Sequence, residues 1–303
     1  MIVHVANPIY DSVFKYLMED ERIAKTILSA LLKKKVEKVE MRPHEYSNEE
    51  KKEISMLRID FGAQIVEDDG TTHIILIELQ KTWVETETLR FRQYLGAQYS
   101  NKNNIDKESL KNTAFPMVAI YLMGHRVGDI EVPVLYVNHK AYDYDGRVVT
   151  HGIPDAFVDS LTHDSIIVQI PLLRGKINNH LDEVLSVFDQ SKADVDDPHL
   201  LRLDVDQYSN DDNMQYLVNR LTAAASSPKI RRDMNVEDEY FSALENRDTK
   251  IMMQDKLLKQ KEQQLEQKNI LVKNMAKALL DKGMSISDIA MMTGMSEAYI
   301  KKL

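Results

Sequence analysis

The sequence predicts an α/β protein in which a mixed central sheet is flanked by helices and followed by a helical C-terminal extension. Runs rich in β-branched residues alternate with stretches whose apolar residues recur at helical spacing. From about residue 248 the composition changes to Lys, Gln, Glu and Leu, without Gly or Pro over the next 34 residues. The 303 residues, 43% of them hydrophobic, suffice for a sizeable core and an appendage.

The composition also excludes several classes of protein. The absence of cysteine excludes disulfides, thiolate metal sites and a cysteine nucleophile. The N-terminus lacks the pattern of a signal peptide, and no apolar run approaches the roughly 20 residues that span a bilayer. We therefore expect a soluble, cytoplasmic protein without a membrane partner. The net charge of −9 argues mildly against nucleic acid, but residues 251–303 carry nine Lys/Arg against six Asp/Glu.

The first half of the chain shows helical spacing, then a hairpin, then helical spacing again. Residues 8–32 have a helical pattern, which the charged residues 19–22 divide into two helices. Residues 33–53 read as a short strand or loop. Two β-rich runs then flank "EDDG" at 67–70, and Asp-Gly between such runs is typical of a hairpin. Residues 84–100 are helical by pattern.

The second half supplies further strands and then mainly helices. The run at 115–123 predicts a buried strand, whose leading proline suits only a strand start or edge. Further strands are predicted at 131–137 and 166–170. Helices are predicted over 174–190, 211–225 and 233–247.

The connector that follows has one seam of a heptad. Ile251, Leu258, Leu265 and Val272 lie seven residues apart. The complementary positions are polar, so the pattern predicts at most a weak coiled coil, through which the chain forms a homodimer. These positions are Gln254, Lys261 and Lys268.

The last residues fit a helix-turn-helix unit. Ala290 suits the helix crossing and Gly294 the turn, while Ser287 and Ser296 are predicted N-caps. The apolar positions of the inner face are Ile289, Met295, Ile300 and Leu303. The alternative is a small packing or dimerisation unit that never contacts DNA.

The strand within "THIILIELQKTW" (72–83) contains an unexpected carboxylate and amide. Glu78 and Gln80 lie two residues apart and so share one face of the strand. Asp60 lies on the preceding strand and approaches Glu78 if the two runs pair. Two converging carboxylates repel each other unless a cation lies between them, and Mg²⁺ prefers such oxygen ligands. A metal held there would activate water, and Gln80 would orient that water or a phosphate oxygen.

A simpler interpretation is also open. Glu78 and Gln80 could face solvent on a half-exposed strand, and Asp60 could pair with Arg58 or Lys81. An Asp followed by Glu-x-Gln is common by chance, so spacing alone does not identify a metal site.

The arrangement resembles the PD-(D/E)XK nuclease superfamily, and more narrowly the recombination-promoting nuclease and putative transposase family of bacteria. The resemblance covers roughly residues 7–250 and rests on the order and spacing of several stretches. These are "DSVFKYLM" (11–18), "LRIDFGAQI" (57–65), "HIILIELQ" (73–80), "LRFRQYLGAQYS" (89–100), "FPMVAIYLMG" (115–124) and "LTHDSIIVQIPLL" (161–173).

This resemblance implies a restriction-endonuclease-like core and a set of site residues. Asp60 and Glu78 would be catalytic metal ligands for Mg²⁺ or Mn²⁺, and Gln80 would stand where the superfamily has lysine. Asp11 would be an outer ligand or hold a water. Arg90 and Tyr94, one helical turn apart, would grip the phosphate backbone of DNA.

The sequence departs from the superfamily pattern at two positions. Ile59, not proline, precedes Asp60. Gln80 keeps hydrogen bonding but lacks the positive charge of lysine, and Lys81 faces the other way unless a bulge re-aims it.

The predicted function is therefore a metal-dependent DNA endonuclease that hydrolyses phosphodiester bonds, linked by resemblance to recombination, mobile elements or defence. One alternative is a catalytically weak nuclease fold that binds DNA or protein. Another is an interaction protein that oligomerises through its connector. The predicted organisation is a nuclease-like domain (1–195), a helical extension (196–247), the connector (248–271) and the helix-turn-helix-like unit (272–303).

Overall fold

The computed structural model describes residues 1–41, 56–67, 70, 72–82, 88–105, 114–153, 155–174 and 177–302. The chain forms two compact units, Met1–Tyr240 and Phe241–Leu303. Each unit is described below by itself. The boundaries of the four segments expected from the sequence remain predictions.

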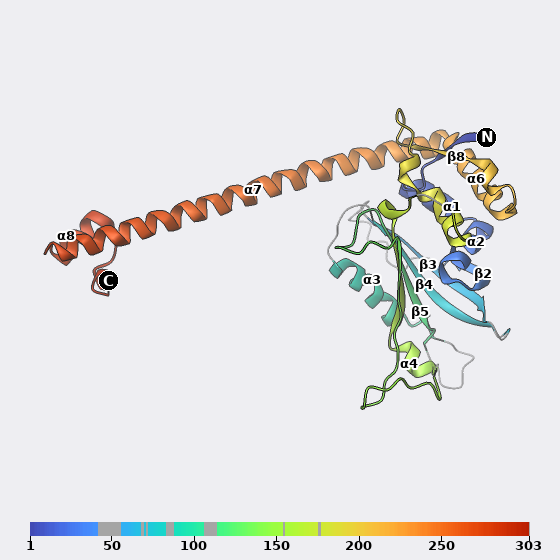
Figure 1. Ribbon diagram of the computed structural model, residues 1–303, viewed down its shortest axis with the longest axis horizontal. Helices are drawn as coiled ribbons and strands as arrows, with labels where there is room; N and C mark the ends of the chain where they lie inside the picture. Colours follow the sequence, from blue (N-terminus) through green and yellow to red (C-terminus); the bar gives the residue numbers. More distant parts are fainter. Residues whose placement is uncertain are drawn as a thin grey trace. The chain divides into compact units, whose positions relative to one another are not determined.

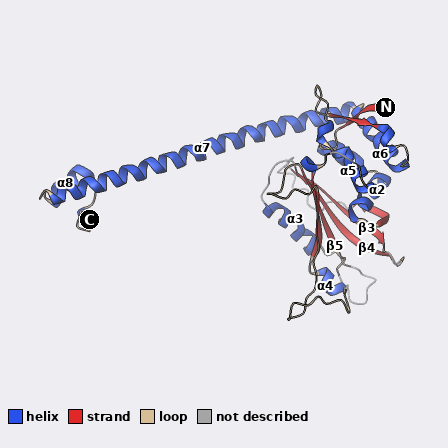
Figure 2. Ribbon diagram, in the orientation of Figure 1, coloured by secondary structure: helices blue, strands red, loops and turns tan. Residues whose placement is uncertain are grey.

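A six-stranded mixed sheet is the centre of the first unit (Figures 1 and 2). Its strands, in spatial order, are β2 (Lys35–Met41), β3 (Met56–Val66), β4 (Thr72–Thr82), β5 (Met117–Met123), β7 (His163–Gln169) and β6 (Val134–Val137). Strands β2, β3 and β4 pair antiparallel, β4, β5 and β7 pair parallel, and β6 returns antiparallel to β7. The predicted α/β class with a mixed sheet is confirmed.

The predicted hairpin is confirmed as β3 and β4. Its register begins with Val66 opposite Thr72 and continues to Met56 opposite Thr82. Gly70 in the turn has φ of 82°, a value that glycine adopts without the strain a Cβ would cause. The β-branched residues of both runs suit this pleated surface.

Helices cover both faces of the sheet. On one face, α1 (Asp11–Met18) and α2 (Glu21–Leu32) bury Phe14, Leu17 and Ile27 against the sheet residues Phe61 and Ile77. On the other face, α3 (Thr88–Ser100) contributes Leu95 to a smaller cluster. Figure 1 shows α3 on the side of the sheet opposite α1 and α2. Residues 84–87 of the predicted helix lie outside the described residues, as does 42–53 of the segment after α2.

The predicted division of residues 8–32 into two helices is confirmed. Asp20 adopts an extended backbone, and its side chain accepts a hydrogen bond from the Ile23 N–H at 3.2 Å. This N-cap begins α2. Lys33 ends the helix with φ of 55°, a left-handed conformation common at helix C-termini.

Several elements were not predicted from the sequence. β1 (Ile2–Ala6) pairs antiparallel with β8 (Leu200–Asp204), and the facing residues Val5 and Leu201 are fully buried. The short helix α4 (Ala156–Ser160) was also missed. Strand β1 is short and its partner lies about 200 residues away, so local pattern carries little signal for it.

The helix predicted over 174–190 is wrong in its extent. Of the described residues in this range, only those of α5 (His180–Leu185) are α-helical, with Asn179 as the N-cap. The chain then tightens into 3₁₀ turns at Ser186–Phe188 and Gln190–Lys192. Asp189 caps the second of these turns, because its side chain accepts from the Ser191 N–H, a local bond that competes with a continuous helix.

The helical part of the chain begins with α6 (Asp212–Ala225), close to its predicted range. Helix α7 (Pro228–Asp281) then runs continuously where separate helical segments were predicted. Its first residues belong to the first unit and its remainder to the second. Within the described part of the chain, no helix is both long enough and apolar enough to cross a membrane.

The second unit ends in two short helices, α8 (Ile286–Thr293) and α9 (Glu297–Ile300). With the end of α7 they enclose a small core of Ala276, Ile289 and Ile300. Gly294 ends α8 with φ of 71°, and Ser296 caps α9 as predicted. The N-cap of α8 is Ser285 and not Ser287, because the chain enters the helix two residues earlier. Leu303 lies outside the described residues.

Candidate active site

The hairpin register brings the predicted carboxylate positions together. Asp60 of β3 and Glu78 of β4 are Cα partners, so they stand directly opposite each other. Opposite positions of an antiparallel pair share one face of the sheet, and Gln80, two residues on, shares that face with Glu78. The side chains of these three residues lie outside what the structure describes. The backbone register places all three positions on one face, with Asp60 opposite Glu78 and Gln80 two residues further along β4.

The buried neighbours explain this register. Phe61 lies opposite Ile77 in the next row, and both side chains are only 1% exposed in the main core. Sheet side chains alternate, so burying this pair turns the Asp60 and Glu78 positions to the other face. A slip of one residue would place the carboxylate positions in the core, at a prohibitive desolvation cost.

Strand β5 connects this face to helix α3. Ala119, opposite Glu78, is fully buried in the cluster that contains Leu95 of α3. Tyr121, opposite Gln80, packs edge-on against Phe91 of α3, with 5.2 Å between ring centroids. Helix α3 therefore lies over the same face, next to the rows of Glu78 and Gln80.

The predicted phosphate-contacting residues belong to this helix. Arg90 and Tyr94 directly precede Phe91 and Leu95, which are α3 residues in contact with the sheet face. Their own side chains lie outside the described part of the chain. The structure thus brings the backbone of five predicted site residues into one region. That their side chains converge on one metal ion and one phosphate stays a prediction.

The other end of α3 forms a polar edge on the same face. The hydroxyl of Tyr99 is 2.7 Å from Nδ1 of His163, which starts β7. Burial raises the pKa of Tyr99 and, as the largest cause, lowers that of His163. Beside them is a hollow of about 240 Å³, into which the bonded amides Gln98 and Asn104 are packed. Since His163 is held by its neighbours in this way, we assign it no catalytic role.

Asp11 belongs to the other layer. It begins α1, whose apolar residues pack on the face of the sheet opposite to α3. The main-chain N–H of Asp11 donates to Oε2 of Glu237 at 2.6 Å, and that of Ser12 donates to Oε1 at 2.9 Å. Glu237 therefore caps α1 from the start of α7, a contact that sequence spacing could not reveal. The predicted role of Asp11 as a ligand stays a prediction.

Charged and aromatic contacts hold the start of α7 in place. Asp238 accepts from the Tyr10 hydroxyl at 2.9 Å and lies 2.7 Å from Nε2 of His199. Arg231 donates two hydrogen bonds to Asp197. Burial and the bond to Asp238 raise the pKa of Tyr10. The position of Asp11 at the start of α1 thus depends on residues more than 200 positions away.

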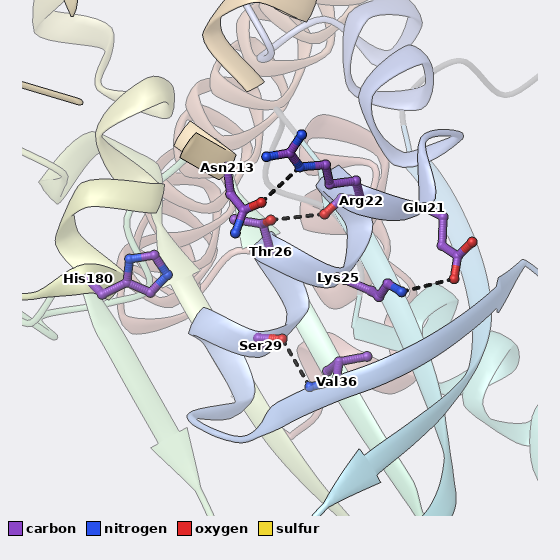
Figure 3. Close-up of a pocket in the computed structure, with 8 residues that line it drawn as sticks. All are labelled: Glu21, Arg22, Lys25, Thr26, Ser29, Val36, His180 and Asn213. Atoms are coloured by element: carbon purple, nitrogen blue, oxygen red, sulfur yellow. Dashed lines mark hydrogen bonds and ion pairs between the residues drawn. The ribbon is translucent and has the colours of Figure 1, made fainter. Parts of the chain in front are cut away.

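A second polar cluster lies beside α2. A hollow of about 380 Å³ has Arg22, Lys25 and His180 in its walls. Figure 3 shows these side chains. Arg22 donates to Asn213 at 2.8 Å, and Lys25 pairs with Glu21 at 3.2 Å.

The carboxylates of Glu183 and Asp211 each lie 3.5 Å from Nδ1 of His180, an atom set that could in principle hold a metal ion. The His-x-x-Glu spacing was visible in the sequence, but the distant Asp211 was not. Ion pairing explains the cluster, and we assign it no catalytic role.

Comparison with models of known protein families, with curated proteins and with solved structures finds no match in any of the three.

Replacing Glu237 with alanine should destabilise the first unit by about 1–2 kcal/mol, because two N–H groups at the start of α1 lose their acceptor. Urea unfolding of the full chain, followed by near-ultraviolet circular dichroism, measures the change. The matched control is Glu239→Ala, which removes an exposed carboxylate two residues along the same helix. Equal midpoints for Glu237→Ala and the wild type would show that the cap contributes nothing.

The contribution of Glu237 should also depend on pH. Burial, the largest cause, and the nearby Asp11 raise the pKa of Glu237 above its ordinary value of 4.5, so the folded state binds this proton more tightly than the unfolded state. The advantage of the wild type over Glu237→Gln should be full below pH 4.5 and be lost as the pH rises through the folded pKa. Unfolding free energies of both proteins across acid to neutral pH measure this. An advantage that grows with pH would contradict it.

Proposed function

We propose that this chain is a metal-dependent DNA endonuclease that hydrolyses phosphodiester bonds. The proposal rests chiefly on the β3–β4 register, in which Asp60 is the Cα partner of Glu78 and Gln80 follows on the same face. The resemblance to PD-(D/E)XK nucleases, and to the recombination-promoting nuclease and putative transposase family, supports the same assignment. A mixed sheet flanked by helices is also the architecture that this resemblance implies.

The donor set suits a hard divalent cation. Two carboxylates on adjacent strands repel each other, and each raises the other's affinity for a proton unless a cation neutralises both. Asp60 and Glu78 would hold Mg²⁺ or Mn²⁺, whose ligands are oxygen atoms. When bound, the metal polarises the phosphate and lowers the pKa of a coordinated water.

The remaining residues would position water and DNA. The Gln80 amide can both donate and accept a hydrogen bond, so it can orient the attacking water against a phosphate oxygen. On α3, Arg90 would neutralise a backbone phosphate and Tyr94 would donate to one. Neither contact depends on the base, so we expect these residues to add affinity for DNA but no sequence preference. The link to recombination, mobile elements or defence is part of the same proposal.

One observation favours a second candidate, a DNA- or protein-binding module with weak catalysis. Gln80 lacks the charge of the superfamily's lysine and cannot neutralise the charge that develops on phosphorus. The helices α8 and α9 would then supply the contact with a partner. Cleavage assays distinguish the two, since only the first candidate requires a divalent cation for its activity.

The first test is plasmid cleavage by the wild type with Mg²⁺, with Mn²⁺ and with EDTA. We expect nicking with either metal, none with EDTA, and a decrease of about 10³-fold or more in Asp60→Ala, because the metal loses a charged ligand. The control Glu67→Gln removes a carboxylate that pairs with Lys34 at the turn end of the hairpin, and it should cleave like the wild type. If the wild type leaves DNA intact with every metal, the catalytic proposal is wrong for this protein alone.

Two substitutions of Gln80 distinguish the contribution of water positioning to catalysis from that of positive charge. Gln80→Ala should lower kcat/KM by about 10²-fold, because the water loses its hydrogen-bonding partner. Gln80→Lys should keep activity at or above that of the wild type, since lysine restores a donor and adds positive charge. Cleavage rates of a fluorescent duplex substrate measure both variants, and the rate of Asp60→Ala gives the background to subtract. Activity unchanged in Gln80→Ala would remove Gln80 from the site.

A further inference from the structure

An exposed apolar stripe lies on the part of α7 that belongs to the second unit. We call Leu257, Leu258, Leu265, Leu271 and Met275 the leucine stripe. Their exposed fractions are 52%, 57%, 61%, 67% and 52%. At 100° per residue the five side chains fall within a sector of about 140°, which is one side of the helix. Residues 257–271 are all exposed, and where this segment borders the terminal helices, at Glu266, Asn269 and Ile270, it lines an open hollow and is not buried.

Such a segment needs a partner. Most helices in proteins derive their stability from packing an apolar face and not from local propensity alone. Single exposed leucines are ordinary, but several on one side of a helix indicate an interaction surface. On the other side of the helix Gln263 and Gln267 are polar, whereas Ile270 lines a hollow with Met295 and Tyr299 of the same unit. The leucine stripe is the side for which the described residues show no such neighbour.

The charges within the stripe indicate what covers it. Lys261 and Lys268 lie in the middle of the stripe, seven residues apart, and Glu262 borders it. Among the described residues, Glu262 has no ion pair. A covering helix must therefore present leucines against the lysine stems and a carboxylate to their ammonium groups. A second copy of this segment carries both.

The orientation follows from the same charges. A parallel pair would place Lys261 beside Lys261 of the partner subunit, and likewise for Lys268, with like charges in the seam. An antiparallel pair places Lys261 against the partner's Leu265 and Lys268 against the partner's Leu258. The two Glu262 carboxylates then approach each other near the dyad, with four lysines around them. Leu257 meets the partner's Leu271 on the flank of the seam.

We propose that the leucine stripe is a homodimer interface in which two copies of α7 pair antiparallel through residues 257–275. This inference is independent of the proposed nuclease activity, because its tests measure mass and cross-linking and not cleavage. The other occupants that chemistry allows, an acidic amphipathic helix of another protein or an anionic surface, correspond to a chain that is monomeric in solution.

Sedimentation equilibrium of the full chain tests the interface. The wild type should be a dimer at the upper end of its soluble concentration range. The double variant Leu258→Glu, Leu265→Glu should be a monomer with unchanged helix content. The matched control Gln263→Glu, Gln267→Glu adds the same charge to the same stretch of helix, on the side away from the stripe, and should remain a dimer. A monomeric wild type, or a dimer that survives the stripe variant, would overturn the proposal.

The absence of cysteine from the chain allows a direct test of orientation. In the antiparallel pair, position 258 faces position 268 of the partner. Oxidation of a mixture of Leu258→Cys and Lys268→Cys chains should therefore give a disulfide heterodimer, whereas neither variant alone should cross-link. Cross-linking of Leu258→Cys with itself, together with no heterodimer beyond that product in the mixture, would show a parallel pair and refute the antiparallel arrangement.

Discussion

The register between β3 and β4 is the constraint on which the rest of the first unit depends. Burial of the Phe61–Ile77 pair turns the neighbouring Asp60 and Glu78 positions to the opposite face of the sheet. Because side chains alternate along a strand, burying the apolar pair necessarily turns the carboxylate positions to the other face. The apolar core thus determines where the polar positions lie, and the candidate site depends on hydrophobic burial on the other side of the same strands.

Each layer of the first unit contributes to the candidate site in a different way. Helix α3 lies over the face that carries Glu78 and Gln80, through Phe91 and Leu95. Helix α1 packs on the core face, and its N-terminus is held by Glu237 from the start of α7. A buried carboxylate that accepts two main-chain N–H groups joins the first helix of the chain to a late one. Elements at opposite ends of the first unit's sequence, α1 and the start of α7, are therefore direct neighbours in space.

In the second unit, several apolar side chains are exposed along one helix. Its small core of Ala276, Ile289 and Ile300 accounts for the terminal helices, whereas the middle of α7 exposes its leucines. Lysines in the apolar seam reduce the stability of any pair, yet they also discriminate between orientations. If the copies pair as proposed, the interface would be specific and weak, and the association would respond to protein concentration.

Local sequence determined much of this protein. The β-rich runs around the Asp-Gly turn predicted the hairpin, and its extended pairing made Asp60 a neighbour of Glu78 in the prediction. Helical spacing predicted α1, α2 and α6, and Gly294 and Ser296 marked the boundaries of the last helices. These features depend on residues close together in the chain, whose conformational preferences are set by their own side chains.

Only the tertiary structure decided the rest. The pairing of β1 with β8, the cap that Glu237 provides and the packing of α3 beside Glu78 join residues far apart in sequence. The short α5 and the early start of α8 at Ser285 were decided by side-chain bonds to the backbone that compete with the helical pattern. Helical or strand periodicity shows which face of an element is buried, but it carries no information about which distant element covers that face.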